Sequence, residues 1–81
     1  MTQMSEKVEG DTLRDQIQGI VRDRQGKEPD GHVPLSYAQM ARITGYSHNR
    51  VIRVVQALIL EGRLAYIPED GPNPRRYRVV E

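Results

Sequence analysis

The sequence predicts a single small α+β domain in which three helices precede a β-hairpin. Apolar residues recur at helical spacing after residue 12, and residues 36–62 have the pattern of two helices joined by a tight glycine turn. Residues 63–80 then contain two short strands around a loop rich in Pro and Gly. We therefore expect residues 1–11 to be a disordered polar tail and residues 12–81 to be the folded domain.

Composition excludes several classes of protein. The 81 residues include no Cys, which excludes a disulfide framework and a thiolate metal site. The polar N-terminus lacks a signal-like apolar segment, and no apolar run approaches the roughly 20 residues of a membrane span. A cytoplasmic protein without a membrane partner is the expectation.

Charge is distributed unevenly along the chain. Residues 1–34 carry five basic and seven acidic side chains, whereas residues 35–81 carry seven basic and four acidic ones. The balances are thus −2 and +3, and all seven basic residues of the second part are arginine. Arginine is the residue best suited to forked contacts with phosphate and with guanine. An ordinary solvated surface is the alternative.

The first helix is predicted to begin at the capping-box-like Thr12–Asp15 and to end near Gly26. Its apolar stripe follows a spacing of i, i+4, i+7 and i+8, at Leu13, Ile17, Ile20 and Val21. A polar loop follows, and then a very short strand over residues 33–35. Pro34 restricts that strand to an edge of the sheet because proline lacks a backbone donor.

Two serines mark the starts of the next two helices. Ser36, with Gln39 three residues later, predicts a capped helix over residues 37–43. Residues 44–46 form the turn, where Gly45 can adopt a positive φ without steric cost. Ser47 then caps a longer helix over residues 48–61, and Gly62 ends it.

The spacing of four residues in this segment resembles that of helix-turn-helix proteins: a small residue, a glycine and two apolar residues, at Ala41, Gly45, Val51 and Val54. With the hairpin, the order of elements over residues 12–80 resembles a winged helix-turn-helix DNA-binding domain. A plain helical hairpin within a small bundle is the alternative to this interpretation.

The stretch Asn49–Leu64 is also similar to recognition helices of winged-helix domains in bacterial and mobile-element regulators. It resembles, in addition, the C-terminal winged-helix domain of FtsK-type DNA translocases and conjugative TraB proteins. The correspondence rests on an Asn-Arg start, an internal arginine and an apolar ladder that ends at glycine: Asn49, Arg50, Arg53, Val54, Val55, Leu58 and Gly62. The resemblance implies binding of double-stranded DNA through the helix that begins at His48.

On this resemblance the start of the second helix faces base edges. Asn49 would pair with adenine, and Arg50 or Arg53 with guanine. His48, Ser47 and the free N–H groups of the helix start would meet a phosphate or a base. The preceding helix would contact the DNA backbone through Ser36, Tyr37, Gln39 and Arg42. The competing interpretation is that the arginines pair with surface carboxylates and that the other polar residues are simply exposed.

The hairpin would be the wing. Alternation along its second strand places Tyr77 and Val79 inward, against Leu64 or Tyr66. The arginines Arg75, Arg76 and Arg78 would then flank DNA phosphates or reach a minor groove, while the acidic tip stays clear of the duplex. An edge strand that carries arginine to prevent aggregation is nearly as good an explanation. Four arginines on phosphates would give a log–log salt slope of about −4.

The predicted function is sequence-specific binding of double-stranded DNA, as expected of a small transcriptional regulator from a bacterium, plasmid or phage, located at the nucleoid when bound. A homodimer or tandem copies on DNA would supply affinity. The alternative is a winged helix for protein contact, or for a DNA segregation, replication or transfer complex. That alternative predicts exposed apolar side chains at positions such as Tyr46, Ile52 and Leu60.

No enzyme, cofactor or metal site is expected. His32 and His48 are the only histidines, and the chain has neither a P-loop nor a glycine-rich phosphate motif. Glu28, Asp30 and His32 have ligand chemistry, but they lie in a polar loop where a solvated turn is the better explanation.

Overall fold

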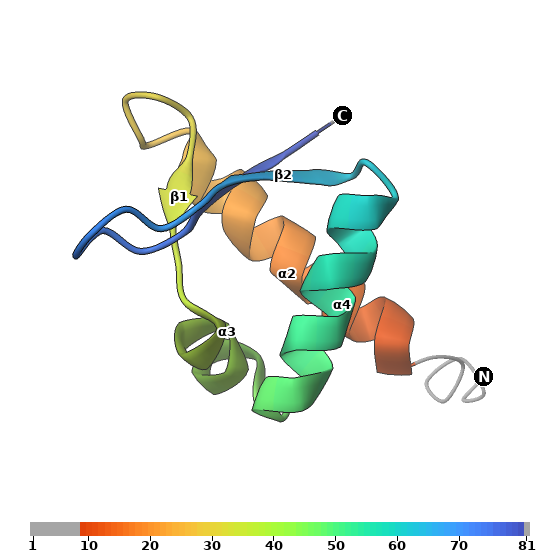
Figure 1. The fold of residues 1–81 in the computed structure, drawn as a ribbon. Helices are drawn as coiled ribbons and strands as arrows, with labels where there is room; N and C mark the ends of the chain where they lie inside the picture. Colours follow the sequence, from red (N-terminus) through yellow and green to blue (C-terminus); the bar gives the residue numbers. More distant parts are fainter. Residues whose placement is uncertain (1–8, 81) are drawn as a thin grey trace.

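Residues 9–80, which the computed structural model describes, form three helices and a three-stranded antiparallel sheet (Figure 1). The predicted α+β class is confirmed. In chain order the elements are α2 (Glu9–Gln25), β1 (Val33–Pro34), α3 (Tyr37–Thr44), α4 (His48–Leu60), β2 (Leu64–Ile67) and β3 (Arg76–Val79). No helix in this range combines the length and the apolar character needed to cross a bilayer.

The first helix begins earlier than predicted. Helix α2 starts at Glu9, so Thr12 lies inside it and does not cap it. Of the tail predicted over residues 1–11, residues 9–11 are therefore helical, and residues 1–8 lie outside the described residues. Local capping patterns give weak evidence for a boundary when helical residues precede them, which explains the error.

The two serine caps are confirmed. Ser36 Oγ accepts a hydrogen bond from the Gln39 N–H at 3.1 Å, and Gln39 Oε1 accepts one from the Ser36 N–H at 2.9 Å. This reciprocal pair is a capping box at the start of α3. Ser47 Oγ accepts from the Arg50 N–H at 3.2 Å and caps α4. Between the helices Gly45 has a φ of 80°, as the tight turn requires.

The sheet has the strand order β1-β3-β2, so β3 is central. Pro34 lies in an edge strand, as predicted, and Val33 pairs with Tyr77 of β3. In the hairpin, Leu64 pairs with Val79 and Tyr66 pairs with Tyr77. Because side chains alternate along a strand, these residues share the sheet face that the helices cover, and Arg76 and Arg78 lie on the other face.

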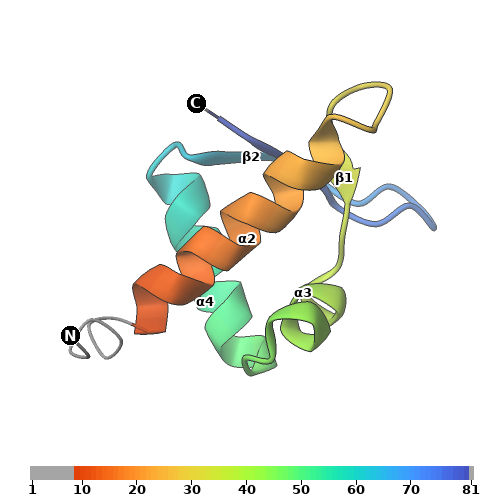
Figure 2. The ribbon, with the colours of Figure 1, turned by 180° about the vertical axis from the view of Figure 1, so that it is seen from behind.

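The core lies between the helices and the covered face of the sheet. Figure 2, the view from behind, shows α2 crossing in front of α4 and the strands. Every element contributes to a single cluster of buried side chains: Leu13, Ile17, Val21, Val33, Leu35, Met40, Val51, Val55, Leu58, Leu64, Tyr77 and Val79. Arg14 of α2 also donates from both terminal nitrogens to Glu61, which follows α4. Packing and this ion pair together fix α4 relative to α2.

Candidate nucleic-acid interface

The start of α4 presents a polar face to solvent. His48, Asn49, Arg50 and Arg53 are all exposed, whereas Val51, Val55 and Leu58 are fully buried. The 3.6-residue period of the helix separates the two sets, because the buried residues recur at spacings of three and four. Val54 and Ile59, which border the buried set, are half-buried. The predicted base-contacting side chains therefore stand clear of the core.

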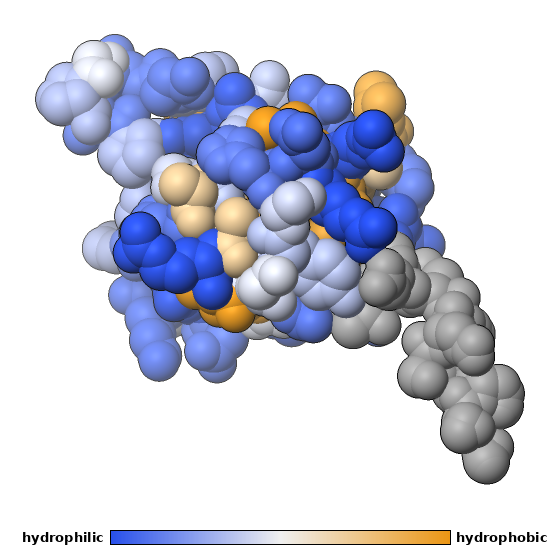
Figure 3. Space-filling view, turned by 90° about the horizontal axis from the view of Figure 1, so that it is seen from below, coloured by the Kyte–Doolittle hydropathy of each residue, from blue (hydrophilic) through white to orange (hydrophobic). Residues whose placement is uncertain are grey.

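The charged side chains that α4 contributes to this face are arginines. Helix α4 contains no acidic residue. Within residues 9–80 the guanidinium of Arg53 makes no hydrogen bond or ion pair, and the same holds for exposed Arg42 on α3. Figure 3, which looks onto the end of the molecule that carries α3 and the start of α4, shows a largely hydrophilic surface with small apolar areas. An anionic ligand would meet two unneutralised arginines there.

The predicted contact residues at the start of α3 are already engaged within the protein. The side chains of Ser36 and Gln39 form the capping box. Tyr37 is half-buried, its ring lies 6.1 Å edge-on from that of His48, and its hydroxyl meets Arg75. These residues hold the two helix starts in place, so among the predicted α3 residues Arg42 offers the most accessible charge.

Arg75 connects the hairpin to α3. Its Nη1 donates to the Tyr37 hydroxyl at 2.6 Å, and its Nε donates to Glu69 Oε1 at 3.2 Å. The guanidinium carbon lies 5.3 Å from the ring centroid of Tyr37 and 5.0 Å from that of Tyr66. Planar stacking and forked donation are properties that distinguish arginine from lysine. We call this group, completed by Tyr77, the Arg75 junction.

Tyr77 forms the buried floor of the Arg75 junction. Its side chain is 1% exposed, and its ring lies 6.3 Å from that of Tyr66. Burial raises the pKa of the Tyr77 hydroxyl above its ordinary value, while a hydrogen bond from Arg75 opposes the rise. Tyr77 is therefore a neutral phenol at any ordinary pH. The carboxylate of Glu69, and not Tyr77, neutralises the charge of Arg75.

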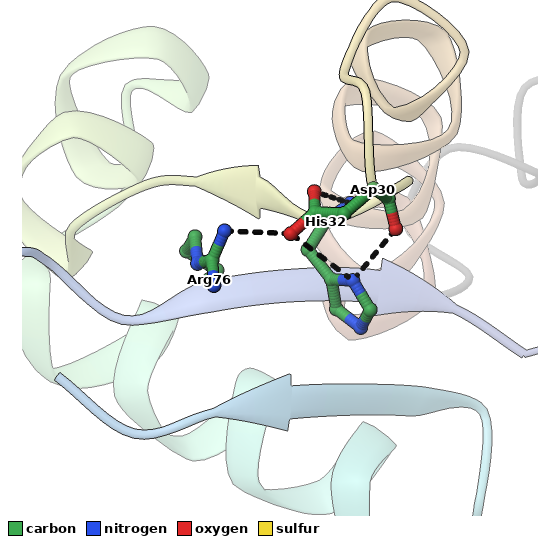
Figure 4. A network of polar contacts seen from close by, with 3 residues as sticks. All are labelled: Asp30, His32 and Arg76. Atoms are coloured by element: carbon green, nitrogen blue, oxygen red, sulfur yellow. Dashed lines mark hydrogen bonds and ion pairs between the residues drawn. The ribbon is translucent and has the colours of Figure 1, made fainter.

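Arg76 is also engaged, on the other face of the sheet. Figure 4 shows its Nη1 donating at 2.7 Å to Oδ2 of Asp30, in the loop between α2 and β1. The His32 N–H donates to Oδ1 of the same carboxylate at 3.1 Å. This backbone hydrogen bond, with the charge of Arg76, lowers the pKa of Asp30. The polar loop is thus a hydrogen-bonded turn that neutralises Arg76 of the hairpin.

The three arginines of the hairpin therefore do not form one surface. Alternation places Arg75 on the side of α3, whereas Arg76 and Arg78 face away from both helices. Arg78 is exposed, beside Gly31 in the loop before β1. The expectation that all three flank the same duplex stays a prediction, and it would require the duplex to reach both faces of the sheet.

Sequence reasoning missed Gln56. This residue is exposed on α4, seven residues after Asn49 and three after Arg53. The same spacing rule that located the buried face would have identified it as part of the outward one. Gln56 also borders an open groove between α4 and the hairpin, lined further by Tyr37, Ile59, Leu60, Tyr66 and Arg75.

Comparison with known proteins gives no match to a family model, to a curated protein or to a solved structure. The support for the candidate interface is therefore the geometry of this structure.

Proposed function

We propose that this domain is a winged helix-turn-helix that binds double-stranded DNA, with α4 as the recognition helix in the major groove. The observation that carries the proposal is the exposed, acid-free start of α4, where Asn49, Arg50 and Arg53 project from a helix whose other face is buried. The order of elements and the left-handed Gly45 between α3 and α4 support the same assignment.

The chemistry of the exposed residues suits a duplex. The amide of Asn49 has the donor and acceptor pair that adenine requires, and the fork of Arg53 matches the N7 and O6 atoms of guanine. Arg42 and Arg50 lie close enough to the start of α4 to meet phosphates. Two arginines on phosphates predict a log–log salt slope of about −2, since each phosphate contact contributes about −0.9.

A small transcriptional regulator is the simplest role for such a domain. One recognition helix gives few base contacts, so a second copy on an adjacent half-site, about 34–36 Å away, would raise both affinity and specificity. Either a homodimer or tandem copies on DNA would supply it, in the cytoplasm and at the nucleoid.

The test is a fluorescence anisotropy titration of labelled duplex at several salt concentrations. We expect the wild-type slope near −2 and a loss of about a hundredfold in affinity for the double variant Arg50→Ala/Arg53→Ala. The charge-matched control Arg22→Ala/Arg24→Ala, in the last turn of α2, should bind within about threefold of wild type. A wild-type slope near zero would overturn the proposal.

One observation favours a second candidate function, contact with another protein. Leu60 is 87% exposed and Tyr66 is 41% exposed, and both border the groove beside α4. Tyr46 and Ile52, the other apolar residues considered for such contact, are half-buried. If Leu60→Ser abolished function in cells while duplex affinity stayed unchanged, protein contact would be the essential activity.

A further inference from the structure

The outward face of α4 carries three side chains with base-specific chemistry in a single line. At about 100° per residue, Asn49, Arg53 and Gln56 fall within an arc of about 60°. All three are exposed. Arg50 lies about 100° from Asn49, to the side of this line, where a phosphate rather than a base edge would be within reach.

Each of these three side chains has a preferred base, which follows from its hydrogen-bond donors and acceptors. Asparagine and glutamine pair in bidentate fashion with adenine, and arginine pairs with guanine. Gln56 lies farther from the helix start than Asn49 does, and its side chain is longer by one methylene. That length suits a position where a straight helix begins to diverge from a curved groove.

Their spacing along the helix sets the spacing of the bases. Four residues separate Asn49 from Arg53, a rise of about 6 Å, and three separate Arg53 from Gln56, about 4.5 Å. Successive base pairs are about 3.4 Å apart. Asn49 and Arg53 would therefore contact base pairs roughly two steps apart, and Arg53 and Gln56 base pairs roughly one step apart.

We propose that α4 recognises a four-base-pair element with an A·T pair first, any pair second, a G·C pair third and an A·T pair fourth, through Asn49, Arg53 and Gln56 in that order. The inference rests on the proposed function, and it makes Gln56 a specificity-determining residue. The site is asymmetric, so its orientation fixes the direction in which the domain lies on the duplex.

The test is selection of bound duplexes from a random library, with wild type and single variants compared by sequencing. We expect Gln56→Ala to lose preference at the fourth pair alone, with about a tenfold drop in affinity for the best site. We expect Arg53→Gln to switch the third pair from G·C to A·T, which a purely structural role would not produce. Arg24→Ala, exposed on α2, is the control and should keep every preference.

The outcomes separate the two proposals. If wild type enriches a sequence but Gln56→Ala retains all its preferences, or Arg53→Gln leaves the third pair unchanged, this inference is wrong and duplex binding stands. If wild type enriches nothing and binds duplex without salt dependence, the proposed function fails and the inference fails with it. Circular dichroism spectra equal to that of wild type establish that the variants are folded.

Discussion

The α3–α4 segment and the hairpin both carry several arginines, but Arg42 and Arg53 of the first differ from Arg75 and Arg76 of the second in what surrounds them. Arg42 and Arg53 on the helices have no carboxylate partner within residues 9–80. In the hairpin, Arg75 is paired with Glu69 and Arg76 with Asp30. A basic residue is available to an anion only when the fold leaves it unneutralised, so Arg42 and Arg53 offer a charge that Arg75 and Arg76 do not.

The two segments also differ in how they are attached to the rest of the domain. Helix α3 is anchored by an apolar side chain, Met40, which is fully buried. The hairpin adds a polar attachment, the Arg75 junction, which remains 29% exposed at Arg75. The following predictions probe this contrast.

Met40→Ala should produce the largest loss of stability. Truncation of a fully buried side chain removes its burial free energy and leaves a cavity, at a cost of about 2–5 kcal/mol in the free energy of unfolding. Ile43→Ala, one turn later on α3 and 47% exposed, should cost less than about 1 kcal/mol. Urea unfolding followed by circular dichroism measures both, and equal losses would show that α3 is not anchored through Met40.

Arg75→Lys should have a smaller but more informative effect. Lysine keeps the charge but loses the fork and the stack between Tyr37 and Tyr66, so we expect a loss of about 1–2 kcal/mol. The salt slope of duplex binding should stay at its wild-type value. Arg78→Lys, three residues later in β3, should change stability by less than about 0.5 kcal/mol. A shallower salt slope with unchanged stability would instead identify Arg75 as a phosphate contact.

Arg76→Ala/Arg78→Ala should change duplex affinity by less than about threefold, or about 0.7 kcal/mol. These side chains lie on the sheet face turned away from α4, in contrast to Arg50 and Arg53. Duplex titrations of this variant and of Arg50→Ala/Arg53→Ala, run side by side, compare the two losses of affinity. A loss as large as that of the α4 variant would mean that the duplex lies against the outer face of the sheet.

Acid should weaken the turn before β1 slightly. The folded pKa of Asp30 is depressed below its ordinary value of 3.8, chiefly by the hydrogen bond from the His32 N–H. Its contribution to stability is therefore complete above the unfolded pKa and is lost as the pH falls through the lower folded value. Asp30→Asn should be less stable than wild type at pH 7, and the difference should shrink toward pH 3. Urea midpoints measure this difference, and a difference that stays constant from pH 7 to pH 3 would contradict the assigned role of the Asp30 carboxylate.

Local patterns predicted much of the fold. Short-range chemistry defines the capping serines, the positive φ of Gly45 and the edge position of Pro34, and sequence spacing alone identified each of them. The start of α2 was predicted incorrectly, because a helix that extends through polar residues lacks the apolar period that marks the rest of it.

The partners of the wing arginines could not be predicted in this way. Arg75 meets Tyr37 across 38 positions, and Arg76 meets Asp30 across 46. Neither pairing follows a helical or strand spacing, since the fold alone brings these residues together. Gln56, by contrast, was within reach of sequence reasoning, because its position on α4 follows from the same period that assigned the valines.

The Arg75 junction also provides an intrinsic spectroscopic probe. The chain contains four tyrosines and no tryptophan, and three of the tyrosines, Tyr37, Tyr66 and Tyr77, surround this one guanidinium. Intrinsic emission and near-ultraviolet circular dichroism will therefore arise mainly from the place where the hairpin meets α3. Spectroscopists can follow docking of the hairpin without attaching a dye.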